Sequence, residues 1–499
     1  MKSSLRSERG IALVLSLFLM MAMSVIAASL MFMSQTETYS SMNYRLMSQA
    51  RYGAESGIQK AANYLMYSYT APTVGGADPI GAYTFTGVSP VTFNGKAVVL
   101  SANPNVPSNY PVAGVQTAFQ NAASGTVPMG GTSVSYQPYA KLMSMQQINV
   151  FGGGQQTIQT WLIVADGSVT TGRTAKEEVT ATIETPAVPA SLYAAFATNG
   201  GCGAMTFGGS ATTDSYDSRT YNGVGGITAA NGGLTSSNGS VGTNGNLGDS
   251  GNAVINGNLS TPRVGVGNCS AGNVDAVTSS GHATINGSVL QLPQAVALPT
   301  PAAPNPLPPT SNVTVDTSAT CATLGLSPPT CVGAAGNLTI TPNGSTVSLG
   351  NVTISAGANI NFAGGNYSIN SITFTGASTM SVVPNTGAVI MNVAGVGQTT
   401  AIDFTGGSFS NGSYNPAEFQ IEYGGTGQVI LTGNSTAAAM VYAPNAAGSL
   451  LGNNDFYGSI VTATLDVAGN AKIHYDRHLS SEFFTVGNTM MSGFSWKRF

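Results

Sequence analysis

The stretch IALVLSLFLMMAMSVIAASLMFM, residues 11–33, decides the fold, because it is 23 residues long and carries no charge. A helix rises ~1.5 Å per residue, so this one is about 35 Å long. The apolar core of a bilayer is ~30 Å thick, and such a helix can span it with some tilt. The leader before it, MKSSLRSERG, holds Lys2, Arg6 and Arg9. Positive charges beside a spanning helix stay in the cytoplasm, which predicts a single inner-membrane helix at 11–33 with the rest of the chain outside the cytoplasm.

This stretch has three interpretations. A cleaved secretory signal has an apolar core of ~7–15 residues followed by small residues, and here AAS (27–29) supplies the small residues but the core is too long. A plain membrane anchor fits both the length and the charges. The third interpretation rests on ERGIALV (8–14), where a short basic leader ends in Gly10 directly before the apolar helix.

The junction at Gly10 resembles that of a type IV prepilin, and RGIALV (9–14) is similar to the start of PilX-type minor pilins. The resemblance implies that 1–10 is a leader and that prepilin peptidase cuts between Gly10 and Ile11. It also implies that the helix packs against other pilin subunits after leaving the inner membrane. Pilins usually carry Glu at the fifth mature position, which is Leu15 here; PilX-like N-termini often lack this Glu.

The helix is expected to continue beyond the membrane. No proline precedes Pro72, and apolar or small residues recur at spacings of three and four after residue 34. We therefore expect one helix from Ile11 to about Tyr67, on the order of 85 Å long, within a segment 11–69. Its stripe needs a partner surface, because propensity alone does not hold a long helix in water. The stripe consists of Met42, Leu46, Ala50, Ala54, Ile58, Ala61 and Leu65.

A face with short side chains lies within this stripe. Residues YR (44–45) and QARYGAESG (49–57) resemble the second half of the PilX N-terminal region. Ala50, Gly53, Ala54 and Gly57, with Glu55 among them, allow another helix or a sheet to approach closely. The partner is either a neighbouring subunit or the chain's own domain, and both uses can coexist.

Composition excludes some functions. Charged residues make up 7% of the chain and the net charge is −4, so there is no basic field to bind nucleic acid. At this length two or more folded units are expected. The four cysteines, Cys202, Cys269, Cys321 and Cys331, suit an exported protein with up to two disulfides. We favour Cys321 with Cys331, which closes a short loop, although three connectivities remain open.

Residues 70–189 are predicted to form a small β-rich domain. The runs QTWLIVA (159–165) and EVTATIE (178–184) bracket a polar loop and predict a long hairpin at the edge of a sheet. The pilin resemblance implies that this sheet lies on the outer half of the helix. Pro186 and Pro189 mark the domain boundary.

Residues 190–485 have a different sequence pattern, with internal repeats and short apolar runs. GNAVING (251–257) recurs as GHATING (281–287), with an echo in GNAKIH (469–474). After a Pro-rich interruption at 292–309, short apolar runs typical of strands alternate with Asn-Gly and Gly-Gly turns. This pattern favours a right-handed parallel β-helix, with coils of about 20–25 residues, over a sandwich. The expected fold is thus an α+β N-terminal part, a long pilin-like helix plus a small antiparallel β domain, then an all-β right-handed parallel β-helix and a C-terminal tail at 486–499.

This second part also carries a resemblance. AMVYAPNA (439–446), GNNDFYGSIV (452–461) and GNAKIHYD (469–476) are similar to a β-helical domain often joined to PilX-like N-termini in bacterial envelope proteins. CG (202–203) and TDSYDS (213–218) resemble its beginning. This resemblance implies an architecture and no activity.

Candidate catalytic and metal-binding residues are few. Glycoside cleavage needs two carboxylates about 5–10 Å apart, and Asp403, Glu418 and Glu422 are the nearby set. The spacing of the two glutamates puts them on one outer strand face, so we interpret them as solvated acids. No catalytic residue and no cofactor are expected, and the chain is not predicted to be an enzyme.

Metal sites are also not expected. His474 and His478 would need a helix to converge on a metal. We favour a structural end-cap in which His474, Asp476 and Arg477 bond across the last coil. Asp214 and Asp217 have oxygen ligands suited to Ca²⁺, but Asx-turns account for them.

These features predict a minor pilin-like subunit of a type IV pilus or related pseudopilus, which promotes filament assembly and displays a β-helical body for adhesion to surfaces or cells through a possible glycan ligand. One alternative is a membrane-anchored envelope scaffold outside any filament. The other is a secreted β-helical carbohydrate-active enzyme.

Overall fold

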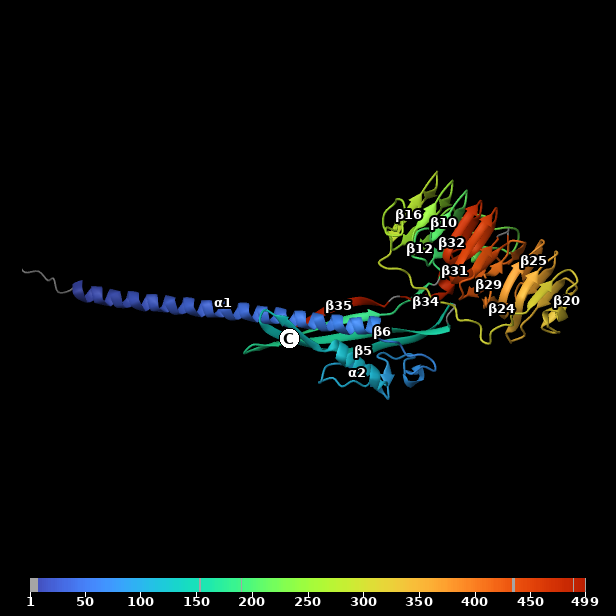
Figure 1. The fold of residues 1–499 in the computed structure, drawn as a ribbon. Helices are drawn as coiled ribbons and strands as arrows, with labels where there is room; N and C mark the ends of the chain where they lie inside the picture. The colour runs from blue at the N-terminus through green and yellow to red at the C-terminus, as the bar shows by residue number, and fades with distance from the viewer. Residues whose placement is uncertain (1–7, 152–153, 190, 433–435, 488, 499) are drawn as a thin grey trace, which may run out of the picture. The chain divides into compact units, whose positions relative to one another are not determined.

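The computed structural model describes residues 8–151, 154–189, 191–432, 436–487 and 489–498 (Figure 1). The chain forms two compact units. Unit 1 comprises Met1–Gln147, Thr157–Pro186 and Val486–Phe499. Unit 2 comprises Ile148–Gln156 and Ala187–Thr485.

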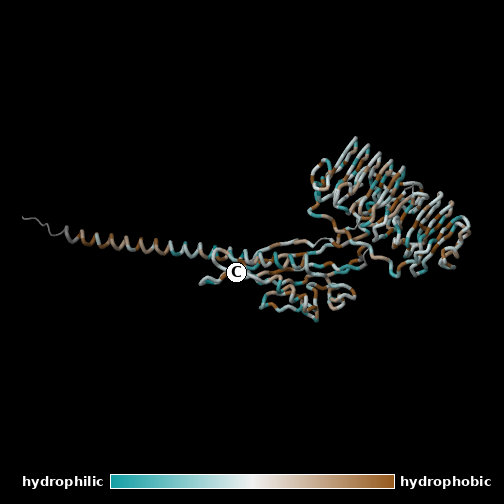
Figure 2. Tube along the Cα trace, in the orientation of Figure 1, coloured by the Kyte–Doolittle hydropathy of each residue, from teal (hydrophilic) through white to brown (hydrophobic). Residues whose placement is uncertain are grey.

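Helix α1 of unit 1 runs without a break from Glu8 to Tyr67, which confirms the predicted long helix. Residues 11–41 are all exposed, whereas buried positions begin at Leu46. Figure 2 shows that the exposed N-terminal half is also the hydrophobic half. The helix ends where the amides of Ser68 and Tyr69 both donate to the Tyr64 carbonyl, a few residues before Pro72.

The C-terminal half of α1 packs on an antiparallel sheet with the strand order β35-β7-β6-β5, to which β3 and β4 add through β5. Apolar side chains of α1, α2 and the sheet form one core that includes Ile58, Phe119 and Ile163. Helix α2 packs on α1 and was not foreseen from the sequence. The elements are β1 (Thr92–Phe93), β2 (Lys96–Ala97), β3 (Val99–Ser101), α2 (Ala113–Ala123), β4 (Gly125–Met129), β5 (Thr132–Val150), β6 (Gly154–Thr170), β7 (Thr174–Glu184) and β35 (Met490–Arg498).

The predicted long hairpin is present, with two corrections. Strands β6 and β7 pair from Thr160↔Glu184 to Thr170↔Thr174, so most of the expected polar loop is strand. The hairpin is not at the sheet edge, because β35 pairs with β7 from Met490↔Glu184 to Arg498↔Glu177. The segment expected to be a C-terminal tail is therefore a strand. Pairing satisfies backbone groups that β7 would otherwise leave open.

Unit 2 is consequently inserted between two neighbouring strands of unit 1. The chain leaves β7 through Pro186, whose carbonyl accepts the Gly487 amide at 2.8 Å. The hydroxyls of Thr185 and Thr489 lie 2.9 Å apart. The two ends of the insertion are thus in contact.

Unit 2 is a stack of short parallel strands. Its first coils form three rows, in which each strand lies in register with the equivalent strand one coil away. One row is β9 (Ala195–Ala197), β12 (Val241–Thr243), β15 (Leu259–Thr261) and β18 (Val289–Gln291); the second is β10 (Met205–Phe207), β13 (Leu247–Asp249) and β16 (Val277–Ser279); the third is β11 (Thr212–Tyr216), β14 (Val254–Ile255) and β17 (Thr284–Ile285).

The later strands continue the parallel stacking. Among the described residues of these strands, only β20 and β21 pair in antiparallel fashion. These strands are β19 (Asn312–Val315), β20 (Cys331–Ala334), β21 (Asn337–Ile340), β22 (Val347–Ile354), β23 (Asn359–Phe362), β24 (Gly365–Phe374), β25 (Ser378–Val382), β26 (Val389–Val393), β27 (Thr400–Asp403), β28 (Gly407–Ser410), β29 (Phe419–Tyr423), β30 (Gln428–Leu431), β31 (Ala438–Gly452), β32 (Asp455–Gly469) and β33 (Lys472–Asp476). Short connections include β8 (Ala187–Pro189), α3 (Leu479–Glu482) and β34 (Phe484–Val486).

The order of coils in space differs from their order in the chain. The last long strand, β32, pairs with β9 at Ile460↔Ala195 and with β10 at Leu465↔Met205. The final coil therefore stacks on the first one, in the middle of the stack (Figure 1). The first coils extend from this seam toward β18, and the later coils approach it from β19.

The Pro-rich segment 292–309 connects the two ends of the stack. Along its course, Val296 exchanges hydrogen bonds with the side chain of Asn244 at 2.7 and 2.9 Å. The carbonyl of Pro299 accepts the Tyr442 hydroxyl at 2.7 Å. The segment thus contacts residues from both halves of the stack. A chain rich in proline, which lacks a backbone donor, suits an extended connection outside the strand ladders.

Candidate functional site

The first half of α1 is a continuous exposed apolar surface. Its side chains from Ile11 to Met33 are 56–70% exposed where they are large and hydrophobic. By length and composition, α1 is the one helix among the described residues that could cross a membrane, and it lies near the N-terminus.

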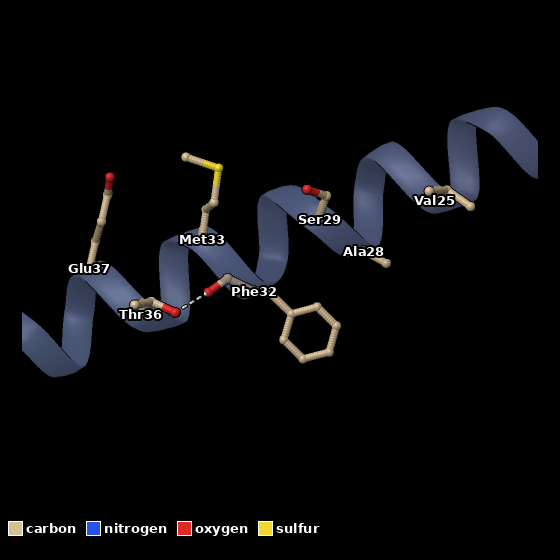
Figure 3. A pocket seen from close by; sticks show the side chains of 7 residues that line it. All are labelled: Val25, Ala28, Ser29, Phe32, Met33, Thr36 and Glu37. Carbon is tan, nitrogen blue, oxygen red and sulfur yellow. Dashed lines mark hydrogen bonds between the residues drawn. The ribbon is translucent and has the colours of Figure 1, made fainter.

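Polar residues in this half satisfy their own hydrogen bonds. The hydroxyls of Ser16, Ser24 and Thr36 donate to carbonyls three or four residues earlier, each at 2.8 Å. Such bonds reduce the cost of placing a hydroxyl in an apolar environment. Figure 3 shows the stripe from Val25 to Glu37, where the short side chains of Ala28 and Ser29 leave a shallow depression beside Phe32.

The predicted processing site lies at the start of this helix. Gly10 and Ile11 are both within α1, and Leu15 is 68% exposed one turn later. Cleavage after Gly10 remains a prediction.

The small-residue face lies against the chain's own sheet. Ala50 and Ala54 are fully buried, and a Cβ at Gly53 would lie 2.4 Å from a methyl carbon of Val134. On the sheet side, Gly167 also has no room for a side chain, because a Cβ there would lie 1.9 Å from the Ala50 carbonyl oxygen. Of the two partners considered above, the structure shows the one within the chain.

At Gly57 the same face is less tightly packed. A Cβ there would lie 3.1 Å from Ala165 and 3.2 Å from Tyr136.

Glu55 ties the helix to the last strand. Its carboxylate accepts the Arg51 Nε at 2.8 Å and the indole N–H of Trp496 at 3.3 Å. The Arg51 guanidinium lies 4.5 Å from the Trp496 ring centroid, a cation–π contact. Sequence reasoning missed Trp496 because it lies 441 positions from Glu55.

Both disulfides are formed in unit 2. Cys202 pairs with Cys269 and Cys321 with Cys331, the pairing favoured above. The first closes a separation of 67 residues and the second one of 10.

The candidate acidic residues do not gather into a site. Asp403 accepts the amide and hydroxyl of Thr405, as in an Asx-turn. Glu418 ends the short helix η4 (Pro416–Glu418), and Glu422 is on β29. Asp217 accepts two bonds from the Arg219 guanidinium and caps the short helix η2 (Ser218–Thr220). Within the described ranges, no group of three His, Cys, Asp or Glu side chains could hold a metal ion.

His474 belongs to the seam between the first and last coils. Its Nδ1 lies 2.5 Å from the Asp214 carboxylate on β11, and its Nε2 lies 3.5 Å from Asp455. The ring stacks on Tyr457 at 4.5 Å. Burial lowers the pKa of His474, but the two carboxylates raise it by more, so the pKa lies above 6.5.

The predicted structural cap of His474, Asp476 and Arg477 is therefore not at an end of the stack. Asp476 accepts the amides of Ser218 and His478, and Arg477 donates to Ser215 and to the Gly233 carbonyl. These bonds do cross between coils, but the coils are in the middle of the stack. The reason is that β33 has a further parallel neighbour, β11, from the start of unit 2.

Comparisons with known proteins support one part of this picture. Residues 9–59 match the PilX N-terminal family model. Residues 334–482 match a domain of unknown function, DUF7305. A solved structure, the competence-associated pilin ComZ from Thermus thermophilus, is 13% identical over 91% of this chain and 98% of that chain, with a TM-score of 0.25. A TM-score this low does not establish a common fold. No curated protein matches the chain.

The PilX-like region, as matched, has two different environments. Residues 11–41 are exposed and mostly apolar, whereas Leu46 to Ile58 contribute buried positions to the core of unit 1. One continuous helix thus joins an exposed apolar surface to a folded domain. The family resemblance and the geometry locate the candidate functional surface at the first half of α1.

Proposed function

We propose that this protein is a minor pilin-like subunit of a type IV pilus or related pseudopilus, whose N-terminal helix promotes filament assembly. The observation that carries the proposal is the exposed apolar half of α1 within a PilX-like region. About 35 Å of apolar helix is stable in a bilayer or against other apolar helices, and unfavourable in water. The same surface serves as membrane anchor before assembly and as packing surface within a filament.

The maturation route follows from the junction before this helix. Prepilin peptidase removes residues 1–10, and the mature chain begins at Ile11. Until assembly, the helix holds the protein in the inner membrane with both folded units outside the cytoplasm. Leu15 leaves the fifth mature position without a carboxylate, which suits a subunit of low abundance rather than the shaft subunit.

Unit 2 is the part displayed. We propose that its parallel stack is a right-handed β-helix and that its polar faces bind surfaces, cells or glycans. Rows of Asn and Ser side chains on the stack support this role; Asn337, Asn359 and Asn361, for example, form a hydrogen-bonded ladder. The proposal includes no enzymatic activity and no nucleic-acid ligand.

The mature N-terminus is the decisive measurement. Protein recovered from sheared surface filaments is analysed by mass spectrometry, and the expected chain begins at Ile11 with an N-methyl group. A matched variant, Gly10→Val, is expected to remain uncleaved and to disappear from the filament fraction. An intact Met1 terminus found in membranes alone would instead support the scaffold alternative, and a start near Ser29 would indicate a soluble secreted protein.

A further inference from the structure

One end of the stack in unit 2 exposes apolar positions that are buried one coil away. Ile255 and Leu259 are 1% and 0% exposed. Their register partners in the end coil are Ile285, which is only partly buried, and Val289, which is 45% exposed. The neighbouring Leu290 is also 45% exposed. The apolar core of the stack is thus open at β17 and β18.

The end coil keeps the features that allow coils to stack. A Cβ at Gly281 would lie 2.8 Å from the Gly251 carbonyl, and one at Gly287 would lie 2.4 Å from the Gly257 carbonyl. These contacts require glycine, because the backbones of successive coils touch there. The Asn286 amide also donates to Asn256 at 2.7 Å. Because the end coil repeats the sequence of the coil below, its outer side presents the same glycine corners and asparagine.

The two ends of the stack differ. At the far end, β20 pairs in antiparallel fashion with β21 and is tied by Cys321–Cys331 to the short helix η3 (Cys321–Leu324). At the near end, a bridge from Val266 to Val277 covers part of β16. Natural sheet edges are usually blunted by charges or proline. Residues 277–291, VTSSGHATINGSVLQ, contain no Asp, Glu, Lys, Arg or Pro.

We infer that the end coil formed by β17 and β18 is a self-association surface that binds the same end of a second copy of this chain. A two-fold contact brings the same patch of the two copies together, so the uncharged strands β17 and β18 meet no like-charge repulsion. A single extended peptide could pair with one strand edge. The end coil of a second copy offers both strands and an equal apolar patch.

The test uses the full chain in detergent micelles and measures its mass by sedimentation over a range of micromolar concentrations. The variants are Val289→Lys and Thr284→Lys, which put a charge on the end coil. Thr284 is exposed, so its substitution leaves folding intact even if Val289→Lys does not. The matched control is Val396→Lys, at a position 46% exposed elsewhere on unit 2.

We expect wild type and V396K to dimerise, and both end-coil variants to dimerise about tenfold more weakly or not at all. The helix is the same in all four proteins, so association through α1 would not distinguish them. Equal association of all four would overturn the inference, and so would a wild type that stays monomeric at the highest concentration.

Discussion

At the scale of single residues, Gly167 illustrates how closely α1 approaches its sheet. The Ala50 carbonyl and the Ala54 amide of the helix occupy the space where a Cβ on Gly167 would project, at 1.9 and 2.5 Å. Backbone atoms on one side and a central strand on the other leave little room for adjustment.

Gly167→Ala should therefore destabilise unit 1 by about 1–3 kcal/mol, the usual cost of overpacking a core. The measurement is denaturant unfolding followed by tryptophan fluorescence, since Trp161 is buried in this core. Gly114→Ala, in α2 with open space around it, is the control and should be neutral or slightly stabilising. Equal stability of the Gly167 variant and wild type would contradict the close helix–sheet contact.

His474 gives a prediction about pH. Its folded pKa lies above the ordinary value of 6.5, since Asp214 and Asp455 stabilise the charged ring. Its contribution to stability is fully present below pH 6.5 and is lost as the pH rises through the higher folded pKa. The pKa of Asp455 is lowered by His474, with Lys472 also nearby, so its contribution is lost only in acid.

The expected result is that the melting temperature of wild type falls relative to His474→Gln between pH 6 and the alkaline range. The difference between the two proteins isolates His474 from other titrating groups. His478→Gln provides a matched control, because His478 pairs with Glu482 outside the seam. A pH-independent difference would show that His474 acts only through packing on Tyr457.

At the scale of elements, β35 completes the sheet of unit 1. Its backbone covers the edge of β7, and Trp496 joins it to α1 through Arg51 and Glu55. Ending the chain after residue 489 should lower the unfolding temperature of unit 1 and increase aggregation, because an open strand edge can pair with other chains.

Trp496→Ala separates the side-chain contribution from the backbone pairing. It keeps the strand and should cost about 1 kcal/mol, typical of a half-exposed cation–π contact. Thermal unfolding and light scattering would compare the two variants with wild type. If the truncated chain were as stable as wild type, β35 would be dispensable for the sheet.

At the scale of the whole molecule, unit 2 is an insertion whose two ends meet. The bond from Gly487 to Pro186 joins the strands on either side of it. Replacing 187–485 with a two-residue Asn-Gly turn should therefore give a folded unit 1, since this turn suits neighbouring antiparallel strands.

Circular dichroism and cooperative unfolding would test the shortened chain. If assembly depends on α1, as proposed, this chain should also enter sheared filaments while losing any adhesion. As a control, Gly10→Val in the shortened chain should abolish filament entry without affecting its folding. A shortened chain that fails to fold would show that unit 1 depends on unit 2.

The sequence by itself determined the local structure of this protein. An uncharged run, an unbroken apolar stripe and the absence of proline before Pro72 specify a long helix, because each depends only on neighbouring residues. Short apolar pulses between glycine corners likewise specify short strands, and the short loop between Cys321 and Cys331 favoured their pairing. The match of residues 9–59 to the PilX N-terminal family agrees with motifs visible in the sequence.

Only the tertiary structure decided which distant segments meet. GNAVING, GHATING and GNAKIH are similar enough to stack in several orders, and the sequence does not state that β33 lies beside β11 rather than at the end. Strand pairing uses backbone groups that every residue carries. Which strands pair therefore depends on how whole coils pack against one another. For the same reason β35, Trp496 and the seam around His474 could not be found from local pattern: their partners lie hundreds of residues away.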